Sequence, residues 1–255
     1  MNTQLNEENR QMWESNADFW DQHMGWEGNR FHNELIAPST IKLLELSAGD
    51  KLLDIGCGNG IFARKMAAKG IEVLAFDFSA QHIKNARSYP SEHIEYKVLD
   101  ATDKTALLSL GENSFKGAVS NMVLMDIPVI KPMFEAVYEL LKPGGAFVFS
   151  TIHPCFNLST HTQVKEIKDV NGRLHEENFV KIGEYIRQSH TTGEAILEQP
   201  VPQYYFHRPI QDLFQLAFAC GFVLDGFEEP VFSSKKEKFF QEIPLVIICR
   251  MRKMP

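Results

Sequence analysis

The strongest constraint on the fold of this chain is a regular alternation of short apolar segments with helical patterns between Lys51 and Thr151. Segments typical of buried strands occur at 51–55, 71–76, 94–100, 117–124 and 146–151. Strands that alternate with helices form a parallel sheet with helices on both of its faces. The alternation therefore predicts an α/β, doubly wound fold.

The C-terminal part of the chain follows a different pattern. Residues 210–222 have the periodicity of an amphipathic helix, and two apolar segments, 223–230 and 245–251, follow with no helical pattern between them. Consecutive strands without a crossover helix usually pair antiparallel. We therefore expect a mostly parallel seven-stranded sheet that ends in a C-terminal antiparallel hairpin.

These patterns divide the chain into four parts. Residues 1–36, rich in aromatic side chains, are expected to form an N-terminal helical cover, and residues 37–151 the ligand-binding core. The regular pattern breaks down over residues 152–208, which contain an Asn-Gly hairpin signal and are expected to form a cap or substrate-recognition insertion. Residues 209–255 are expected to complete the core sheet.

Charge and cysteine content argue against some partners and sites. The net charge of -7 argues against a nucleic acid as the main partner, because phosphate binding rests on clustered Lys and Arg. Residues 1–20 lack the features of a signal peptide, and no apolar run approaches the length of a membrane span, so we expect a cytoplasmic protein without membrane association. Four scattered cysteines without a CxxC pair indicate neither a zinc site nor a disulfide scaffold.

A glycine-rich segment, "KLLDIGCGNGIF", directly follows the first predicted strand. Its three glycines at alternate positions allow a tight turn and a close approach of a ligand to the backbone. A dinucleotide fingerprint would need a glycine where Ile61 stands, and no Gly-Lys-Ser/Thr follows as a phosphate loop requires. Asp54 would repel a pyrophosphate and would favour an ammonium or sulfonium group. The segment therefore predicts a site for a cationic ligand.

Further acids end the second and third predicted strands. Asp77 is placed to accept hydrogen bonds from two ribose hydroxyls, and Asp100 to accept from an exocyclic amino group while the Ala101 amide meets a ring nitrogen. Ile83, on the helix after Asp77, is a candidate to pack on the base. Purely structural roles stay open for Asp54, as a strand-end acid, for Asp77, as a helix cap, and for Ile83, as a core residue. Asp103, in the same segment as Asp100, stays open as the alternative acid.

Four segments together resemble the class I S-adenosylmethionine-dependent methyltransferases. They are "LLDIGCGNG", "FDFSAQHIKNAR", "VLDATD" and "LLKPGGAFVFST". The resemblance covers residues 35–151 closely and the C-terminal part more loosely. It implies the Rossmann-like methyltransferase fold, with S-adenosylmethionine as cofactor and S-adenosylhomocysteine as product.

The resemblance also implies which residues contact the cofactor. It places Asp54, Gly56, Cys57 and Gly58 around the methionyl end, Asp77 and Phe78 at the ribose, Asp100 and Ala101 at the adenine, and Asn121 and Met122 beside the sulfonium.

The acceptor side is less defined by the sequence. The fourth-strand segment "SNMVLMD" lacks the Asp/Asn-Pro-Pro-aromatic signature of enzymes that methylate amino groups of bases or glutamine amides, and it lacks a carboxylate cluster for magnesium, so no metal is predicted. His153, directly after the fifth strand, is a candidate general base for a hydroxyl acceptor, and a structural role in the turn before Pro154 is the alternative. His207 is the second catalytic candidate. The candidate substrate-binding residues are Trp20, Met125, Tyr204, Tyr205 and Arg208.

The sequence thus predicts an enzyme that transfers a methyl group from S-adenosylmethionine to a small organic acceptor at oxygen, nitrogen or carbon. A run similar to "HRP...L...GF...EP", from His207 to Pro230, also occurs in small-molecule methyltransferases. The protein is expected to be a monomer or homodimer. Two alternatives stay open: a methyltransferase that acts on protein or RNA, and a non-catalytic protein that binds the cofactor.

Overall fold

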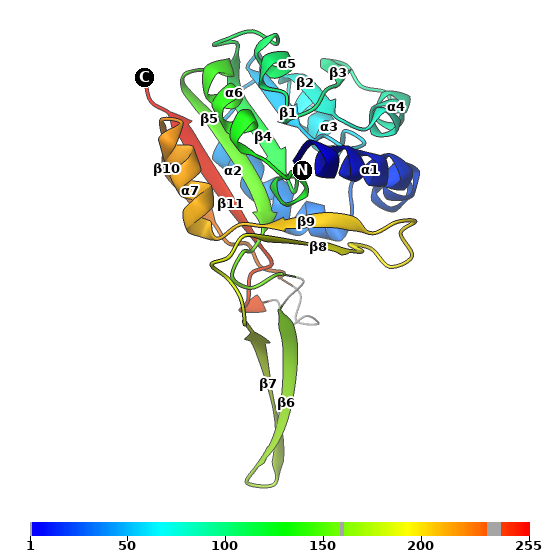
Figure 1. Ribbon diagram of the computed structural model, residues 1–255, viewed down its shortest axis with the longest axis vertical. Helices are drawn as coiled ribbons and strands as arrows, with labels where there is room; N and C mark the ends of the chain where they lie inside the picture. Colours follow the sequence, from blue (N-terminus) through cyan, green and yellow to red (C-terminus); the bar gives the residue numbers. More distant parts are fainter. Residues whose placement is uncertain (1, 159–160, 234–240) are drawn as a thin grey trace.

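The computed structural model describes residues 2–158, 161–233 and 241–255. Its main sheet has the strand order β10-β11-β5-β4-β1-β2-β3. The strands are β1 (Lys51–Ile55), β2 (Glu72–Asp77), β3 (Ile94–Val98), β4 (Phe115–Asn121), β5 (Leu141–Ile152), β10 (Phe222–Glu228) and β11 (Val246–Lys253). Helices lie on both faces of the sheet, as Figure 1 shows. The predicted doubly wound α/β fold is confirmed.

The helices follow the predicted order along the chain. They are α1 (Asn2–Met24), η1 (His32–Ile36), α2 (Ala37–Leu44), α3 (Ile61–Ala67), α4 (Ala80–Ser88), α5 (Lys104–Leu108), η2 (Leu124–Asp126), α6 (Lys131–Leu140) and α7 (Ile210–Ala219). Ser79 caps α4 by accepting a hydrogen bond from the His82 amide.

The apolar character of the central strands follows from their burial on both faces. Along β1, Leu53 and Ile55 belong to one hydrophobic core, whereas Leu52 belongs to the core on the opposite face. Successive side chains of a strand point to opposite faces, so a sheet covered on both sides needs apolar residues at every position. This is why the strands appear in the sequence as continuous apolar runs.

The C-terminal strands form the predicted hairpin. β11 pairs antiparallel with β10 on one side and with β5 on the other, so β11 is the reversed strand of an otherwise parallel sheet. No helix separates β10 from β11 in the described part of the chain, and two strands joined in this way pair antiparallel.

The fifth strand begins earlier than expected. The sequence predicts a helix that continues to Leu141 and ends at "KPGG", but α6 ends at Leu140 and Leu141 already pairs with Phe115 of β4. A register shift between Phe115 and Gly117 accommodates the extra residues. A Cβ at Gly145 would stand 2.8 Å from the Lys142 carbonyl oxygen, so only glycine fits this bulge.

The region between β5 and α7 contains two hairpins. The first pairs β6 (Thr162–Val170) with β7 (Arg173–Lys181) around Asn171 and Gly172, whose φ values of 54° and 78° are those of a two-residue hairpin turn. The second pairs β8 (Ser189–Gly193) with β9 (Gln203–His207). Figure 1 shows the β6–β7 ribbon extending away from the sheet, whereas β8 and β9 lie beside α1. Only the second hairpin is therefore placed to contribute to a site at the sheet edge.

Within the described residues, no helix combines the length and the apolar character that are needed to span a membrane.

Candidate functional site

A cavity of about 760 Å³ lies at the carboxyl ends of β1, β2, β3 and β4. This is the edge at which open α/β sheets hold their ligands. The predicted residues that line the cavity are Asp54, Gly56, Cys57, Gly58, Asp77, Phe78, Asp100, Ala101, Asn121 and Met122 of the cofactor set, and Trp20, Met125 and Tyr205 of the substrate set. The fold thus brings together residues from four separate strand ends.

The glycine loop after β1 forms one wall. Gly56 has a φ of +68°, and a Cβ there would stand 2.5 Å from a methyl group of Val123. A Cβ at Gly58 would meet only His82 Nδ1, 4.0 Å away, so the backbone at Gly58 borders open space. The loop therefore presents bare backbone to a ligand, as its glycines predict.

Asp77, at the end of β2, is bound to the same loop. Its Oδ2 accepts a hydrogen bond from the Gly58 amide at 3.0 Å, and its Oδ1 accepts one from the Ser79 amide at 2.9 Å. A carboxylate offers about four lone-pair sites. Asp77 can therefore hold the loop in place and still accept two hydrogen bonds from a ligand.

Asp54 is a buried carboxyl without a compensating cation. Its side chain is 2% exposed, and Oδ2 has no hydrogen-bond partner among the described residues. Burial raises the pKa of Asp54 from 3.8 to about 7, and the nearby charge of Asp77 contributes to the rise. A buried carboxyl of this kind is suited to a cationic ligand.

Asp100, after β3, has several partners within the protein. Its Oδ1 accepts from the Thr102 amide and hydroxyl at 2.7 and 2.8 Å, and its Oδ2 accepts from Asn6 Nδ2 at 2.6 Å. Asn6 belongs to α1 and also lines the cavity. Because few lone pairs of Asp100 remain free, its contribution to ligand binding is restricted more than that of Asp77.

Helix α1 covers the cavity and is hydrogen-bonded to the loops that follow β1, β2, β3 and β4. Asp21 bonds to Asn59 after β1 (2.8 Å), Glu14 to Ser79 after β2 (2.6 Å), Asn6 to Asp100 after β3 (2.6 Å) and Asn9 to the Asp126 carbonyl after β4 (2.6 Å). The sequence predicts a helical cover but gives no signal for these contacts, because the bonded residues are ordinary polar residues of a helix.

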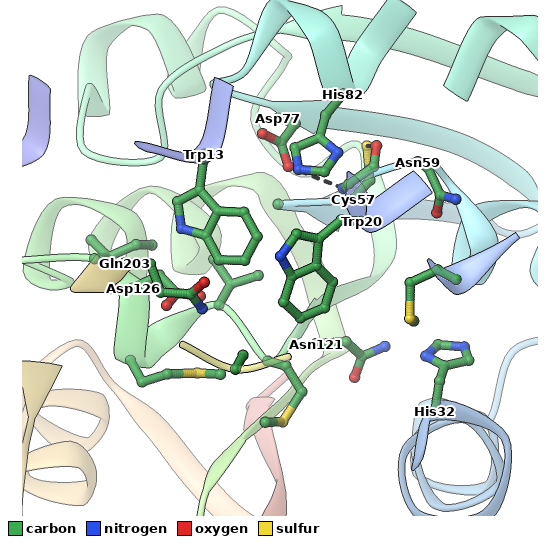
Figure 2. Close-up of a pocket in the computed structure, with 18 of the residues that line it drawn as sticks. Trp13, Trp20, His32, Cys57, Asn59, Asp77, His82, Asn121, Asp126 and Gln203 are labelled. Carbon is green, nitrogen blue, oxygen red and sulfur yellow. Dashed lines mark hydrogen bonds between the residues drawn. The ribbon is translucent and has the colours of Figure 1, made fainter. Parts of the chain in front are cut away.

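Two tryptophans of α1 face the cavity (Figure 2). Trp13 and Trp20 are about two helical turns apart and therefore lie on the same face of α1. Their ring centroids are 5.4 Å apart, and the ring planes are inclined by 52°. Both indole Nε1 atoms are buried and have no hydrogen-bond partner within the described part of the chain. Trp20 is a predicted substrate residue, whereas Trp13 is not. The two indoles provide an aromatic wall with two free donors.

Asp126, in η2, was not identified from the sequence. Its side chain is 7% exposed, it lines the cavity, and its Oδ1 has no partner. Burial raises the pKa of Asp126 well above 3.8, and the charge of Asp77 raises it further. A sequence signal for Asp126 exists, because Asp126 is an acid shortly after the end of β4, just as Asp77 is an acid at the end of β2. The apolar run at 122–125 reads as a continuation of β4, which ends at Asn121.

The two catalytic candidates lie outside the lining of this cavity. His153 is 2% exposed; its Nε2 lies 2.8 Å from Glu229 Oε1, and its Nδ1 accepts a hydrogen bond from the Cys155 amide at 3.1 Å. Burial lowers the pKa of His153 below 6.5. His207 lines a separate small cavity of about 10 Å³, and its Nε2 donates to the Tyr185 carbonyl. Neither histidine lines the cavity that contains Asp54, Asp77 and Asp100.

Two other predicted contact residues also lie outside the lining. Ile83 is fully buried in the hydrophobic core. Tyr204 donates a hydrogen bond to Glu8 of α1 at 3.0 Å. Both side chains stabilise elements that surround the cavity.

Arg208 binds the loop that carries Asp126. Its guanidinium donates to the carbonyl oxygens of Leu124 (2.9 Å), Ile127 and Pro128 (3.0 Å). Burial lowers the pKa of Arg208 from 12.5 to about 10, so it keeps its charge at neutral pH. Arg208 lines the small cavity beside His207 and holds the loop after β4 from outside the large cavity.

Replacing Arg208 with lysine is expected to destabilise the protein by roughly 2 to 4 kcal/mol, because an ammonium group cannot satisfy three carbonyls as a planar guanidinium does. Urea unfolding followed by circular dichroism measures this change. The matched control is Arg187→Lys at an exposed Glu184 pair, for which the expected change is below about 0.5 kcal/mol. Equal free energies of unfolding for the two variants would show that the hydrogen bonds of Arg208 to the three carbonyls do not stabilise the protein.

In the described residues, no group of three or more His, Cys, Asp or Glu side chains is arranged to hold a metal ion.

Comparison with known families agrees with this geometry. Residues 53–149 match the family model described as a methyltransferase domain. This match begins in β1 and ends in β5, so it covers the strands whose ends form the cavity.

Curated relatives and solved structures are similar to this chain over different extents. A ubiquinone biosynthesis O-methyltransferase of Acinetobacter baylyi is 32% identical over 146 residues, which are 54% of this chain and 58% of the relative. The chain thus spans about half the length of the curated relatives it matches.

A crystal structure of an S-adenosylmethionine-dependent methyltransferase from Mesorhizobium loti superposes with a TM-score of 0.66 and 25% identity, covering 84% of this chain and 96% of that one. The [4+2]-cyclase SpnF shares the fold at 15% identity, with a TM-score of 0.61 and coverage of 96% and 95%. Because the same fold occurs in a protein named as a cyclase, the fold alone does not establish the reaction.

Proposed function

We propose that this chain, a class I S-adenosylmethionine-dependent methyltransferase by its domain and fold, transfers a methyl group to a small organic acceptor. One observation carries the proposal. A single cavity combines the acids at the ends of β1, β2 and β3 with an aromatic wall from α1 and a separate buried acid after β4. The part of the cavity that is lined by the acids of β1, β2 and β3 suits a cationic nucleoside. The part between the aromatic wall of α1 and the acid after β4 suits a second, largely apolar molecule.

The residues of the first part fit S-adenosylmethionine. Asp77 has two free acceptor positions for the ribose hydroxyls, and the bare backbone at Gly58 allows close approach. The unpaired carboxyl of Asp54 suits the positive charge of the methionyl end. We assign the adenine to the wall formed by Asp100 and Ala101. When bound, the cofactor supplies an electrophilic methyl group on a sulfonium.

The protein's contribution to such a reaction is alignment and exclusion of water. Helix α1 covers the cavity and is bonded to four strand-end loops, so a bound acceptor is held against the cofactor in a dry environment. The cavity volume of about 760 Å³ lies in the range of small-molecule sites. The similarity to ubiquinone biosynthesis O-methyltransferases supports a small-molecule acceptor for this chain as well.

Titration calorimetry of the purified chain is expected to show binding of S-adenosylmethionine and S-adenosylhomocysteine at a single site. Incubation with pools of small phenols, amines and thiols is then expected to release S-adenosylhomocysteine in at least one pool. Absence of binding would contradict the proposal. Binding without turnover in any pool would favour a non-catalytic cofactor-binding protein, and turnover on protein or RNA alone would favour a macromolecular acceptor.

A further inference from the structure

Asp126 is a buried cavity carboxyl that the cofactor assignment leaves unused, whereas Glu194, which also lines the cavity, is exposed. It lies after β4, and in Figure 2 it is beside Gln203 and near Trp13. Its Oδ1 is fully buried without a partner, and no ion pair is found for it among the described residues. A buried carboxyl without a partner is costly. Because this carboxyl nevertheless lines a cavity, its position points to a ligand that donates a hydrogen bond to it.

The backbone around Asp126 is held from two sides. Asn9 of α1 donates to the Asp126 carbonyl at 2.6 Å, and Arg208 donates to the carbonyls of Leu124, Ile127 and Pro128. These contacts satisfy the backbone and leave the side chain free. The carboxyl is therefore fixed toward the cavity by groups that do not neutralise it.

Among the residues that the structure describes, the groups that face Asp126 include no free cation. From β2, the negative charge of Asp77 raises the pKa of Asp126, and from β9, Tyr205 has its own pKa raised by burial and by Asp126. Asn9 and Trp13 face this region from α1, and Gln203 donates to the Tyr205 hydroxyl at 3.2 Å. The guanidinium of Arg208 is directed to backbone carbonyls. The surroundings are thus acidic, aromatic and neutral.

We propose that Asp126 binds and deprotonates the methyl acceptor, and that the acceptor is a neutral, largely apolar compound with a phenol-type hydroxyl. This inference rests on the proposed methyl transfer and specifies its substrate class. Asp126 would be a catalytic residue, and Arg208 and Asn9 would be positioning residues.

The choice of a neutral hydroxyl follows from charge and from acidity. A cationic amine would have to lie beside the positive sulfonium and would be repelled by it. A phenol has a pKa near 10, as in tyrosine, so a carboxyl with an elevated pKa is a better matched base for it than for an alcohol of much weaker acidity. The unpaired indole N–H groups of Trp13 and Trp20 can donate to a second oxygen on the same ring.

The proton and electron balance of the step is complete without a further reactant. The acceptor oxygen forms a bond to the methyl carbon as its O–H bond breaks, and the proton passes to the carboxylate of Asp126. The electron pair of the broken carbon–sulfur bond remains on sulfur. The products are a methyl ether, a neutral thioether and protonated Asp126, which returns its proton to water after product release.

Acceptor binding can be tested without turnover. Trp26 is 49% exposed and does not line the cavity, so a Trp26→Phe background leaves the two cavity tryptophans as the only indole fluorophores. With S-adenosylhomocysteine saturating, 4-propylphenol is expected to quench this fluorescence with at least tenfold higher affinity than 4-propylanisole. The phenol is preferred because only the phenol carries a proton that Asp126 can accept.

The variant Asp126→Asn separates the base from the rest of the site. It is expected to remove the preference for the phenol over the anisole and to lower kcat on the phenol at least 100-fold. For the unmodified protein, kcat/KM is expected to fall as the pH drops below the pKa of Asp126, because the carboxylate is the active form, whereas the residual rate of the variant is expected to lack this limb. Asp103→Asn, at the cap of α5 outside the cavity, is the matched control.

The outcomes distinguish this inference from the proposed function. Calorimetry with S-adenosylhomocysteine verifies that Asp126→Asn is folded and binds the cofactor. Cofactor binding together with a failure of the phenol to bind, faster methyl transfer from S-adenosylmethionine to 4-propylbenzylamine than to 4-propylphenol, or an unchanged pH profile in Asp126→Asn would overturn the inference alone. Failure of the unmodified chain to bind the cofactor would overturn both.

Discussion

An Asp77→Asn variant is expected to bind S-adenosylmethionine about 100-fold more weakly than the unmodified protein. The carboxylate holds the glycine loop through the amides of Gly58 and Ser79 and has two remaining acceptor positions for a ribose. Hydrogen bonds to a charged group contribute about 1.5 to 3 kcal/mol each. Asparagine keeps one acceptor oxygen but loses the charge and the other acceptor, so a loss of about 2.8 kcal/mol, roughly one such bond, corresponds to this change in affinity. Titration calorimetry at pH 8 measures it directly.

The control for this experiment is Asp103→Asn, which makes the same substitution at a helix cap where asparagine functions as well as aspartate. Its affinity for the cofactor is expected to be unchanged. If Asp77→Asn retained normal affinity while remaining folded, Asp77 would be only a structural ligand of the glycine loop, and the ribose assignment would be wrong.

Replacing Asp54 with asparagine is expected to have opposite effects on stability and on binding. At pH 8 the Tm of the free protein is expected to rise by about 5 °C, because a buried, unpaired charge is removed while a buried amide offsets part of the gain. Binding of S-adenosylmethionine is expected to weaken by about tenfold or more, because the amide cannot pair with a cation. Differential scanning fluorimetry and calorimetry measure the two effects.

The pH dependence of this stability effect follows from the pKa of Asp54. Folding raises that pKa from 3.8 to about 7, so the folded state binds the proton more tightly than the unfolded state. Stability is therefore lost as the pH rises between about 4 and 7, by roughly 4 kcal/mol in total. The advantage of Asp54→Asn should be largest at pH 8 and close to zero at pH 5. An equal shift at both values would rule out a buried charge as the cause.

Much of the fold could be predicted because it depends on periodic burial. The central strands are covered on both faces, so they appear as continuous apolar runs, as in β5 from Ala146 to Phe149. The reversed β11 could be predicted because a missing helix has only one common structural consequence, antiparallel pairing. The boundary of α6 and β5 was placed less well, because a strand that begins with a bulge does not follow the alternation of a regular strand.

The meeting of three acids in this cavity could be predicted for a related reason. Parallel strands end at one edge, so Asp54 near the end of β1, Asp77 at the end of β2 and Asp100 after β3 meet in space. The same rule applies to Asp126, but the apolar residues 122–125 conceal the end of β4. His153 follows β5, and from the sequence it could equally face the cavity or the C-terminal part. In the structure it lies against Glu229.

The sequence by itself determined the order of strands and helices, the reversed last strand and the acids at three strand ends, because each depends on local periodicity or on the direction of a strand. Only the tertiary structure decided what covers this edge and which polar groups there have partners. Helix α1 is far from the strand-end loops in sequence, and its contacts with Asn59, Ser79 and Asp100 come from packing alone. Packing also leaves Asp54 Oδ2 and Asp126 Oδ1 without a partner among the described residues, and whether a buried carboxyl oxygen has a partner is a property of its surroundings in space.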